Sequence, residues 1–154
     1  MRGNNLLAQD KKELKMRVVK LTLAALSAAL IIFAIAALPE RICFGGGENY
    51  IFYCGTSSSD CRTVRADKNA KLTRVFLDNV CGESTEYKEL DIEQFLSSVN
   101  GKIIFSESAA GITSYYCSAD LPYSVVIDGA EINLHIAVCE NSVKVGSPII
   151  FGGY

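Results

Sequence analysis

The sequence predicts an α+β protein: one N-terminal transmembrane helix, then a small domain with one helix packed on a mainly antiparallel β-sheet. Three observations predict this class. Residues 21–38 are apolar and carry no charge, residues 91–101 combine helical periodicity with signals at both ends, and short β-prone runs separated by turn residues surround that helix. The chain has 154 residues, 49% of them hydrophobic. An apolar run of this kind excludes an ordinary cytosolic globule and leaves room for a single domain.

The charges of the N-terminal segment predict an orientation in the membrane. Residues 1–20 hold six basic and two acidic side chains, a net charge of +4, whereas the rest of the chain holds nine basic and fifteen acidic ones, a net charge of −6. Lys and Arg beside an apolar segment stay on the cytoplasmic side, so we expect residues 1–20 inside the cell and the domain outside. As a helix, residues 21–38 measure about 27 Å, close to the ~30 Å hydrocarbon core of a bilayer.

Two other interpretations of the apolar run remain open. Ala34-Ile35-Ala36 approximates the small-x-small site of a signal peptide, and cleavage near Ala36 would release a secreted protein. The length of the run and of the basic segment before it favours an uncleaved signal-anchor. The remaining alternative is a buried helix of a soluble protein.

The chain beyond the anchor divides into a linker and one domain. Residues 39–50 are expected to be a linker because they contain Gly45-Gly46-Gly47, and residues 51–154 to be the extracytoplasmic domain. No structure is predicted for the polar, mostly basic residues 62–71. Strands are expected at residues 51–54, 73–81, 102–107, 112–118, 124–127, 130–139 and 143–151, with turns at 82–84 and 109–111.

The one expected helix of the domain has a signal at each end. Asp91 can cap its first turn and Gln94 follows three residues later, while Asn100-Gly101 supplies a C-terminal stop. Between these ends, apolar residues recur at helical spacing. They are Ile92, Phe95, Leu96 and Val99.

The C-terminal strands have a turn signal and a face pattern. Asp128-Gly129 suits the positive φ angles of a two-residue type I′ turn between strands 124–127 and 130–139. In the second strand, alternation puts one apolar set on the buried face and His135 and Cys139 on the other. The buried set is Ile132, Leu134, Ile136 and Val138. Pro148 cannot donate to a strand ladder, so strand 143–151 is expected at an edge or with a bulge.

All six cysteines follow the apolar run, so in an oxidising medium they predict up to three disulfides. They are Cys43, Cys54, Cys61, Cys81, Cys117 and Cys139. Extending the register of the Asp128-Gly129 turn puts residue 118 opposite residue 139. We therefore favour a Cys117–Cys139 pair, with a bulge near Pro122 closing the one-residue mismatch. Reduced, buried cysteines are the alternative.

The sequence contains no recognisable catalytic, cofactor-binding or metal-binding motif. There is no Cys-x-x-Cys, no G-x-S-x-G and no phosphate-binding glycine loop. The one histidine, His135, is about 13 Å along its strand from Cys139, too far for a Cys–His pair. We expect no enzyme and no cofactor, and the acidic domain excludes nucleic acid as a partner.

The C-terminal third resembles a known family. The matching residues are Gly101-Lys102, the strand Ile112 to Tyr116, the strand Ile132 to Val138 with Asn133 and Ala137, and the ending Val145 to Tyr154 with Gly146-Ser147-Pro148-Ile149-Ile150. Over roughly the last 55 residues the chain is similar to the YwmB-like family of secreted or membrane-anchored Firmicutes proteins. The resemblance implies an α+β domain likened to the TATA-box-binding-protein fold and no assigned activity. The six cysteines and the shorter domain depart from the family.

These observations favour a non-enzymatic binding module at the bacterial cell envelope. The expected partners are the lipid bilayer and an envelope protein or the cell wall. Tyrosines pair apolar area with a polar tip, and an edge strand can accept a partner strand. The expected contact residues are therefore Tyr115, Tyr116, Ile149 and Phe151. The alternative function is a cell-surface enzyme, or an enzyme accessory, that uses His135.

Overall fold

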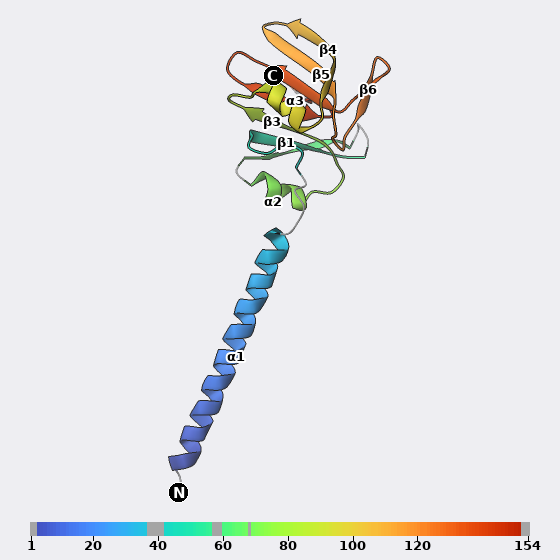
Figure 1. The fold of residues 1–154 in the computed structure, drawn as a ribbon. Helices are drawn as coiled ribbons and strands as arrows, with labels where there is room; N and C mark the ends of the chain where they lie inside the picture. Colours follow the sequence, from blue (N-terminus) through green and yellow to red (C-terminus); the bar gives the residue numbers. More distant parts are fainter. Residues whose placement is uncertain (1–2, 37–41, 57–59, 68, 152–154) are drawn as a thin grey trace. The chain divides into compact units, whose positions relative to one another are not determined.

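The chain forms two units, an N-terminal helix and a β-sheet domain that contains residues 40–154 (Figure 1). The computed structural model describes residues 3–36, 42–56, 60–67 and 69–151, and within the first helix the side chains of residues 13–34. The helix, α1, spans Gly3–Ala36. The elements of the domain are β1 Glu48–Cys54, β2 Arg62–Ala66, α2 Ala70–Val75, β3 Val80–Tyr87, α3 Ile92–Ser98, β4 Lys102–Ala109, β5 Ile112–Ser118, β6 Val125–Ile127, β7 Ala130–Ile132, β8 Leu134–Val138 and β9 Val143–Ser147.

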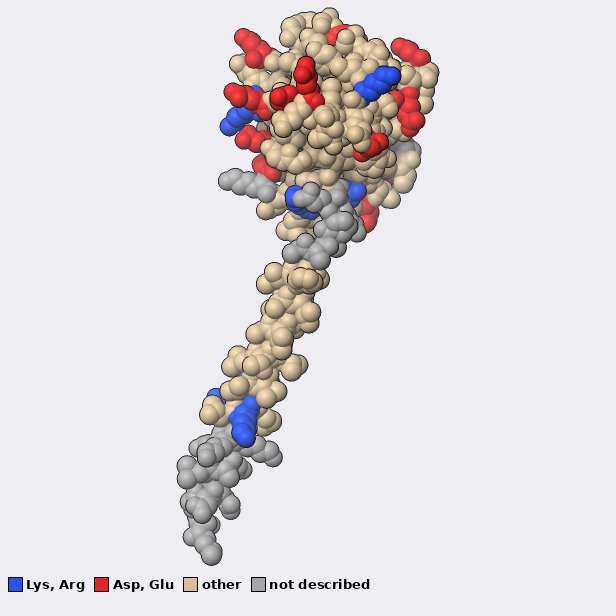
Figure 2. Space-filling model, in the orientation of Figure 1, with Lys and Arg blue, Asp and Glu red and all other residues tan. Residues whose placement is uncertain are grey.

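Helix α1 contains residues 21–36 of the apolar run, and none of the side chains described there, up to Ala34, is buried. The stretch from Glu13 to Ala34 is long and apolar enough to cross a membrane, and all of its side chains are exposed. Figure 2 shows Lys and Arg near the N-terminal part of the helix and a length without charge after them. A signal sequence near the N-terminus meets the same criteria of length and composition.

The domain is built on one seven-stranded antiparallel sheet with the strand order β2-β1-β3-β9-β8-β5-β4. The short β6–β7 hairpin forms a separate two-stranded sheet and extends away from the main one (Figure 1). The predicted fold class, an apolar N-terminal helix followed by an α+β domain with an antiparallel sheet, is confirmed.

One face of the sheet holds both apolar clusters of the domain. In the larger cluster, Phe95 and Leu96 of α3 pack against Phe44 and the central strands. In the smaller one, Phe52 packs with Ala70 of α2. Phe52 pairs with Glu83 on β3, and Thr85, two residues further along β3, pairs with Val145. Paired residues point to the same side, so the two helices cover the same face.

The second face is covered by the chain itself. Residues 148–151 follow β9 and turn back over the sheet, where the backbone N–H of Ile150 donates to Nδ1 of His135 at 3.3 Å. Phe151 packs edge-on against Tyr53, with the ring centroids 4.7 Å apart. His135 and Ala137 are consequently buried, although they lie opposite the predicted buried face. The predicted set is itself buried, except for Val138, which is half-buried.

The predicted helix cap at Asp91 and the predicted turn at Asp128-Gly129 are confirmed. The carboxylate of Asp91 accepts the backbone N–H of Gln94 at 3.0 Å, and α3 ends one residue before Val99. Asp128 and Gly129 both have positive φ angles, 50° and 82°, and join β6 to β7.

Residues 73–87 differ from the prediction. The strand expected at 73–81 is wrong, because α2 runs to Val75 and β3 begins only at Val80. The turn expected at 82–84 is also wrong, since these residues lie inside β3. The glycine at position 82 predicted a turn, but in the structure it allows close packing. A Cβ at this position would lie 2.7 Å from the carbonyl oxygen of Ser147. Close packing against β9 therefore explains this glycine.

Two further expectations are corrected by the topology. Strand β9 lies in the interior of the sheet between β3 and β8, and the edges are β2 and β4. Pro148 follows the end of β9, so it removes no ladder hydrogen bond. The expected linker is also ordered from Ile42 onward: Phe44 is buried in the larger apolar cluster and β1 begins at Glu48.

Candidate binding site

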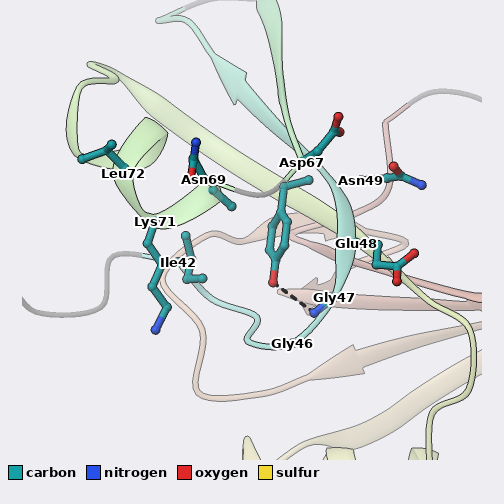
Figure 3. A pocket seen from close by; sticks show the side chains of 11 residues that line it. Ile42, Gly46, Gly47, Glu48, Asn49, Asp67, Asn69, Lys71 and Leu72 are labelled. Atoms are coloured by element: carbon teal, nitrogen blue, oxygen red, sulfur yellow. Dashed lines mark hydrogen bonds between the residues drawn. The ribbon is translucent and has the colours of Figure 1, made fainter.

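A pocket of the domain lies between residues 42–50 and the start of α2 (Figure 3). Its volume is about 770 Å³, within the range of small-molecule sites. Figure 3 shows Ile42 and Lys71 on one side and Glu48 and Asn49 on the other. The lining residues are Ile42, Gly46, Gly47, Glu48, Asn49, Tyr50, Asp67, Asn69, Ala70, Lys71 and Leu72.

Tyr50 holds the wall of the pocket in place. Its hydroxyl accepts the backbone N–H of Gly47 at 3.1 Å and donates to the carbonyl of Phe44 at 2.8 Å. A side chain at Gly47 would overlap Thr85 of β3, so only glycine lets the segment lie this close to the sheet. Tyr50 is buried, and its ring stacks beside Phe52. The wall is therefore preformed by hydrogen bonds between the Tyr50 hydroxyl and the main chain.

The rim of the pocket mixes hydrogen-bonding groups with small apolar surfaces. It carries the carboxylates of Glu48 and Asp67, the amides of Asn49 and Asn69, and the ammonium group of Lys71. Leu72 adds an apolar side chain that is 47% exposed. These groups suit a ligand that has amides, hydroxyls or both, together with some apolar surface.

A buried polar group, Glu83, lies behind the wall. Its Oε1 accepts the backbone N–H groups of Cys43 at 2.5 Å and Phe44 at 3.2 Å, and the residue is fully buried. Burial raises the pKa of Glu83 to about 6, against the lowering effect of those hydrogen bonds. Among the described atoms, Glu83 Oε2 and Arg74 Nε are buried without a hydrogen-bond partner. Glu83 thus fixes residues 43–44 at an electrostatic cost.

Cys43 is a poor nucleophile in this setting. Burial, followed by the adjacent Glu83 carboxylate, raises the pKa of its thiol far above the usual range. The thiolate is the reactive form of cysteine, so Cys43 stays protonated and inert at neutral pH.

His135 lies on the second face of the sheet, opposite the pocket wall and the larger apolar cluster. It is buried and stacks on Tyr116, with ring centroids 4.5 Å apart. Burial lowers the pKa of His135 to about 4, although Glu107 acts in the opposite direction. The imidazole is therefore neutral at pH 7 and lies beneath residue 150.

The four predicted contact residues do not form one surface. Tyr115 packs against the larger apolar cluster on the helix-covered face. Tyr116 lies on the second face between Phe105 and His135, and its hydroxyl donates to Glu107 at 2.6 Å. The other two residues follow β9: Ile149 is half-buried and Phe151 is 46% exposed.

The strand register separates Cys117 from Cys139. The hairpin register is as expected, with Val126 opposite Glu131, but the chain changes partner at Asn133 and β8 pairs with β5. Cys117 faces Leu134, and Cys139 follows Val138 at the far end of the strand pair, about 16 Å away at strand rise. At this change of partner, the side-chain amide of Asn133 bonds both the N–H and the C=O of Ala119.

The other cysteines are distributed unevenly. All six are free thiols in the structure, and Cys54, Cys61 and Cys81 gather where β1 ends. Within the described part of the chain, no group of three or more His, Cys, Asp or Glu side chains could hold a metal ion.

In comparisons with known proteins, no family model, no curated protein and no solved structure matches the chain. The resemblance of the C-terminal third therefore stays a prediction. The pocket was not predicted either, because residues 67–72 carry no pattern that distinguishes a rim from any other polar segment.

Proposed function

We propose that this chain is a single-pass membrane protein whose domain, outside the cell, binds an amide- or hydroxyl-rich component of the envelope through the pocket beside α2. The observation that carries the membrane part is the fully exposed apolar stretch Glu13–Ala34. In water, such a surface would exceed the apolar patches that monomeric soluble proteins tolerate. A bilayer removes this cost, and the basic residues before it favour a cytoplasmic N-terminus.

The binding part rests on the construction of the pocket. Its wall is preformed by the Tyr50 hydrogen bonds, and its rim presents amides, carboxylates and an ammonium group around a small apolar surface. A preformed wall lowers the ordering cost of binding. Cell-wall glycopeptides carry amides, hydroxyls and small apolar side chains, and they are therefore the ligand class that this rim suits.

Titration calorimetry of the full chain in detergent micelles with soluble cell-wall glycopeptides tests the binding part. Leu72→Arg places a long charged side chain at the rim and is expected to weaken binding at least tenfold. Phe76→Arg is the matched control, because Phe76 is 77% exposed, ends the same helix and does not line the pocket. Absence of saturable heat with the unchanged chain, or equal binding by both variants, contradicts the proposal.

The second candidate, a cell-surface enzyme that uses His135, is tested by His135→Ala. The proposal expects this variant, if folded, to bind glycopeptides as the unchanged chain does, because His135 does not line the pocket. Loss of a cellular function with the pocket and fold intact would favour the enzyme.

A further inference from the structure

The chain places three thiols together at one end of the sheet, and two of them are exposed. Cys54 is the last residue of β1, Cys61 immediately precedes β2, and Cys81 is the second residue of β3. Cys61 and Cys81 are exposed, whereas Cys54 is only 2% exposed and packs in the smaller apolar cluster. This arrangement separates one structural thiol from two accessible ones.

The regular sheet would keep Cys61 and Cys81 apart. Strands β2 and β3 pair with opposite edges of β1, so their backbones lie about 9.5 Å apart, which is two strand spacings. A disulfide needs Cα atoms about 4.4–6.8 Å apart. A contact between the two thiols therefore requires the chain to cross the end of β1.

Gly55 lets the chain make this crossing. A Cβ on Gly55 would lie 2.9 Å from the Cα of Cys61, so the returning chain lies close to the position that a side chain would occupy. On its other side, the backbone N–H of Gly55 donates to the carbonyl of Asn79 at 2.9 Å, just before β3. Gly55 therefore lies between the chain entering β2 and the chain entering β3 and is close to both.

The β1–β3 ladder is irregular at Cys81. Tyr53 pairs with Gly82 but Cys54 pairs with Val80, so Cys81 is left without a partner residue on β1. Its thiol lies 3.4 Å from the carbonyl oxygen of Tyr53, to which it donates. Partial desolvation and then Cys61, whose side chain interacts with that of Cys81, raise the pKa of the Cys81 thiol.

We propose that Cys61 and Cys81 form a disulfide bond that joins the β1–β2 loop to the start of β3. The inference rests on the proposed placement of the domain outside the cell, where the medium is oxidising. With a small disulfide as oxidant, the thiolate of one cysteine attacks an oxidant sulfur and releases one thiol. The second cysteine then attacks the mixed disulfide and releases the other thiol. The protein loses two hydrogen atoms and gains one S–S bond, and the oxidant is reduced to two thiols.

Mass spectrometry of the full chain, purified in detergent and equilibrated with oxidised glutathione, tests the pair. Trypsin cleaves after Arg41, Arg62, Arg74 and Lys88, so the bond links peptide 42–62 to peptide 75–88 with the loss of two hydrogen atoms. The linked species is expected in the unchanged chain and in Cys139→Ser, the matched control at the far end of β8. It is expected to be absent from Cys61→Ser and from Cys81→Ser.

Each outcome decides the pairing. Six alkylatable thiols after oxidation, or a linked species that persists in Cys61→Ser, overturns it, since peptide 42–62 also contains Cys43 and Cys54. A folding failure of Cys61→Ser is bypassed by Cys61→Ala and by fragmenting the linked peptides of the unchanged chain, which locates the bonded sulfurs directly.

A second measurement separates this inference from the proposed location. Thiols are trapped by alkylation in intact cells before lysis, and the same peptides are measured. A linked species in cells supports both the pair and an oxidising location. A species that forms with glutathione but is absent in cells supports the pair and contradicts the location outside the cell.

Discussion

Replacing Glu83 with Gln should change the pH dependence of stability in a direction set by burial. Burial raises the pKa of Glu83 from 4.5 to about 6 in the folded chain. The contribution of Glu83 to the free energy of unfolding is fully present below pH 4.5. It is lost as the pH rises toward 6, because the folded state then has to ionise a buried carboxyl. The loss is about 2 kcal/mol, from about 1.4 kcal/mol per pH unit. Gln keeps an acceptor for the N–H groups of residues 43 and 44 and does not ionise.

His135 has the opposite effect in the same pH range. Burial lowers its pKa from 6.5 to about 4, so its contribution is complete above pH 6.5 and falls by about 3 kcal/mol as the pH drops to 4. Between pH 4.5 and 6, the unfolding free energy from Glu83 falls with pH while that from His135 rises, and the two changes cancel in the unchanged chain. Glu83→Gln removes the contribution that falls. The unfolding free energy of this variant should therefore rise with pH across this range.

Urea unfolding of the full chain in micelles measures this effect. All seven tyrosines lie beyond α1 and there is no Trp, so tyrosine fluorescence reports on the domain alone. The unfolding free energy of Glu83→Gln minus that of the unchanged chain should increase by about 2 kcal/mol between pH 4.5 and 6.5. Glu131→Gln, which removes an exposed carboxylate, is the control. A difference for Glu83→Gln that does not vary with pH would refute the argument from burial.

Two further variants test the packing of the sheet. Gly82→Ala should lower the unfolding free energy by about 2 kcal/mol or more, because its Cβ meets a β9 carbonyl at 2.7 Å, whereas Gly45→Ala, with no atom within 4 Å, should have little effect. Asn133→Ala leaves the N–H and C=O of Ala119 without their side-chain partner and should cost about 1–3 kcal/mol, measured in urea beside the exposed control Asn141→Ala. Equal stabilities within either pair would contradict the contact concerned.

Features with a local cause were predictable from the sequence. Asp91 caps α3 through an N–H three residues away, and Asp128-Gly129 adopts the two positive φ angles of its turn. Such signals depend on neighbouring residues alone. The apolar run 21–38 likewise predicts a membrane-length helix from composition and length.

Features that depend on distant pairing were not predictable. The glycine at position 82 has the same composition signal whether it forms a turn or packs against β9, and only the long-range pairing of β3 distinguishes the two. Where the chain changes its strand partner after the hairpin, Asn133 binds a backbone fourteen residues away, a contact that the local sequence does not indicate. The pocket depends on Tyr50 bringing residues 44–47 back toward β1, a contact with no signature in the sequence.

Lysine labelling of intact cells tests the central claim, a membrane-anchored chain with its domain outside. The chain carries lysines on both sides of the apolar run: Lys15 and Lys20 before it, Lys88 and Lys102 in the domain. The Lys88 side chain is 81% exposed. A membrane-impermeant amine reagent should modify Lys88 and Lys102 in intact cells, and Lys15 and Lys20 only after lysis. Modification of Lys15 and Lys20 in intact cells, protection of Lys88 until lysis, or the absence of Lys15 and Lys20 from the mature chain would contradict the account.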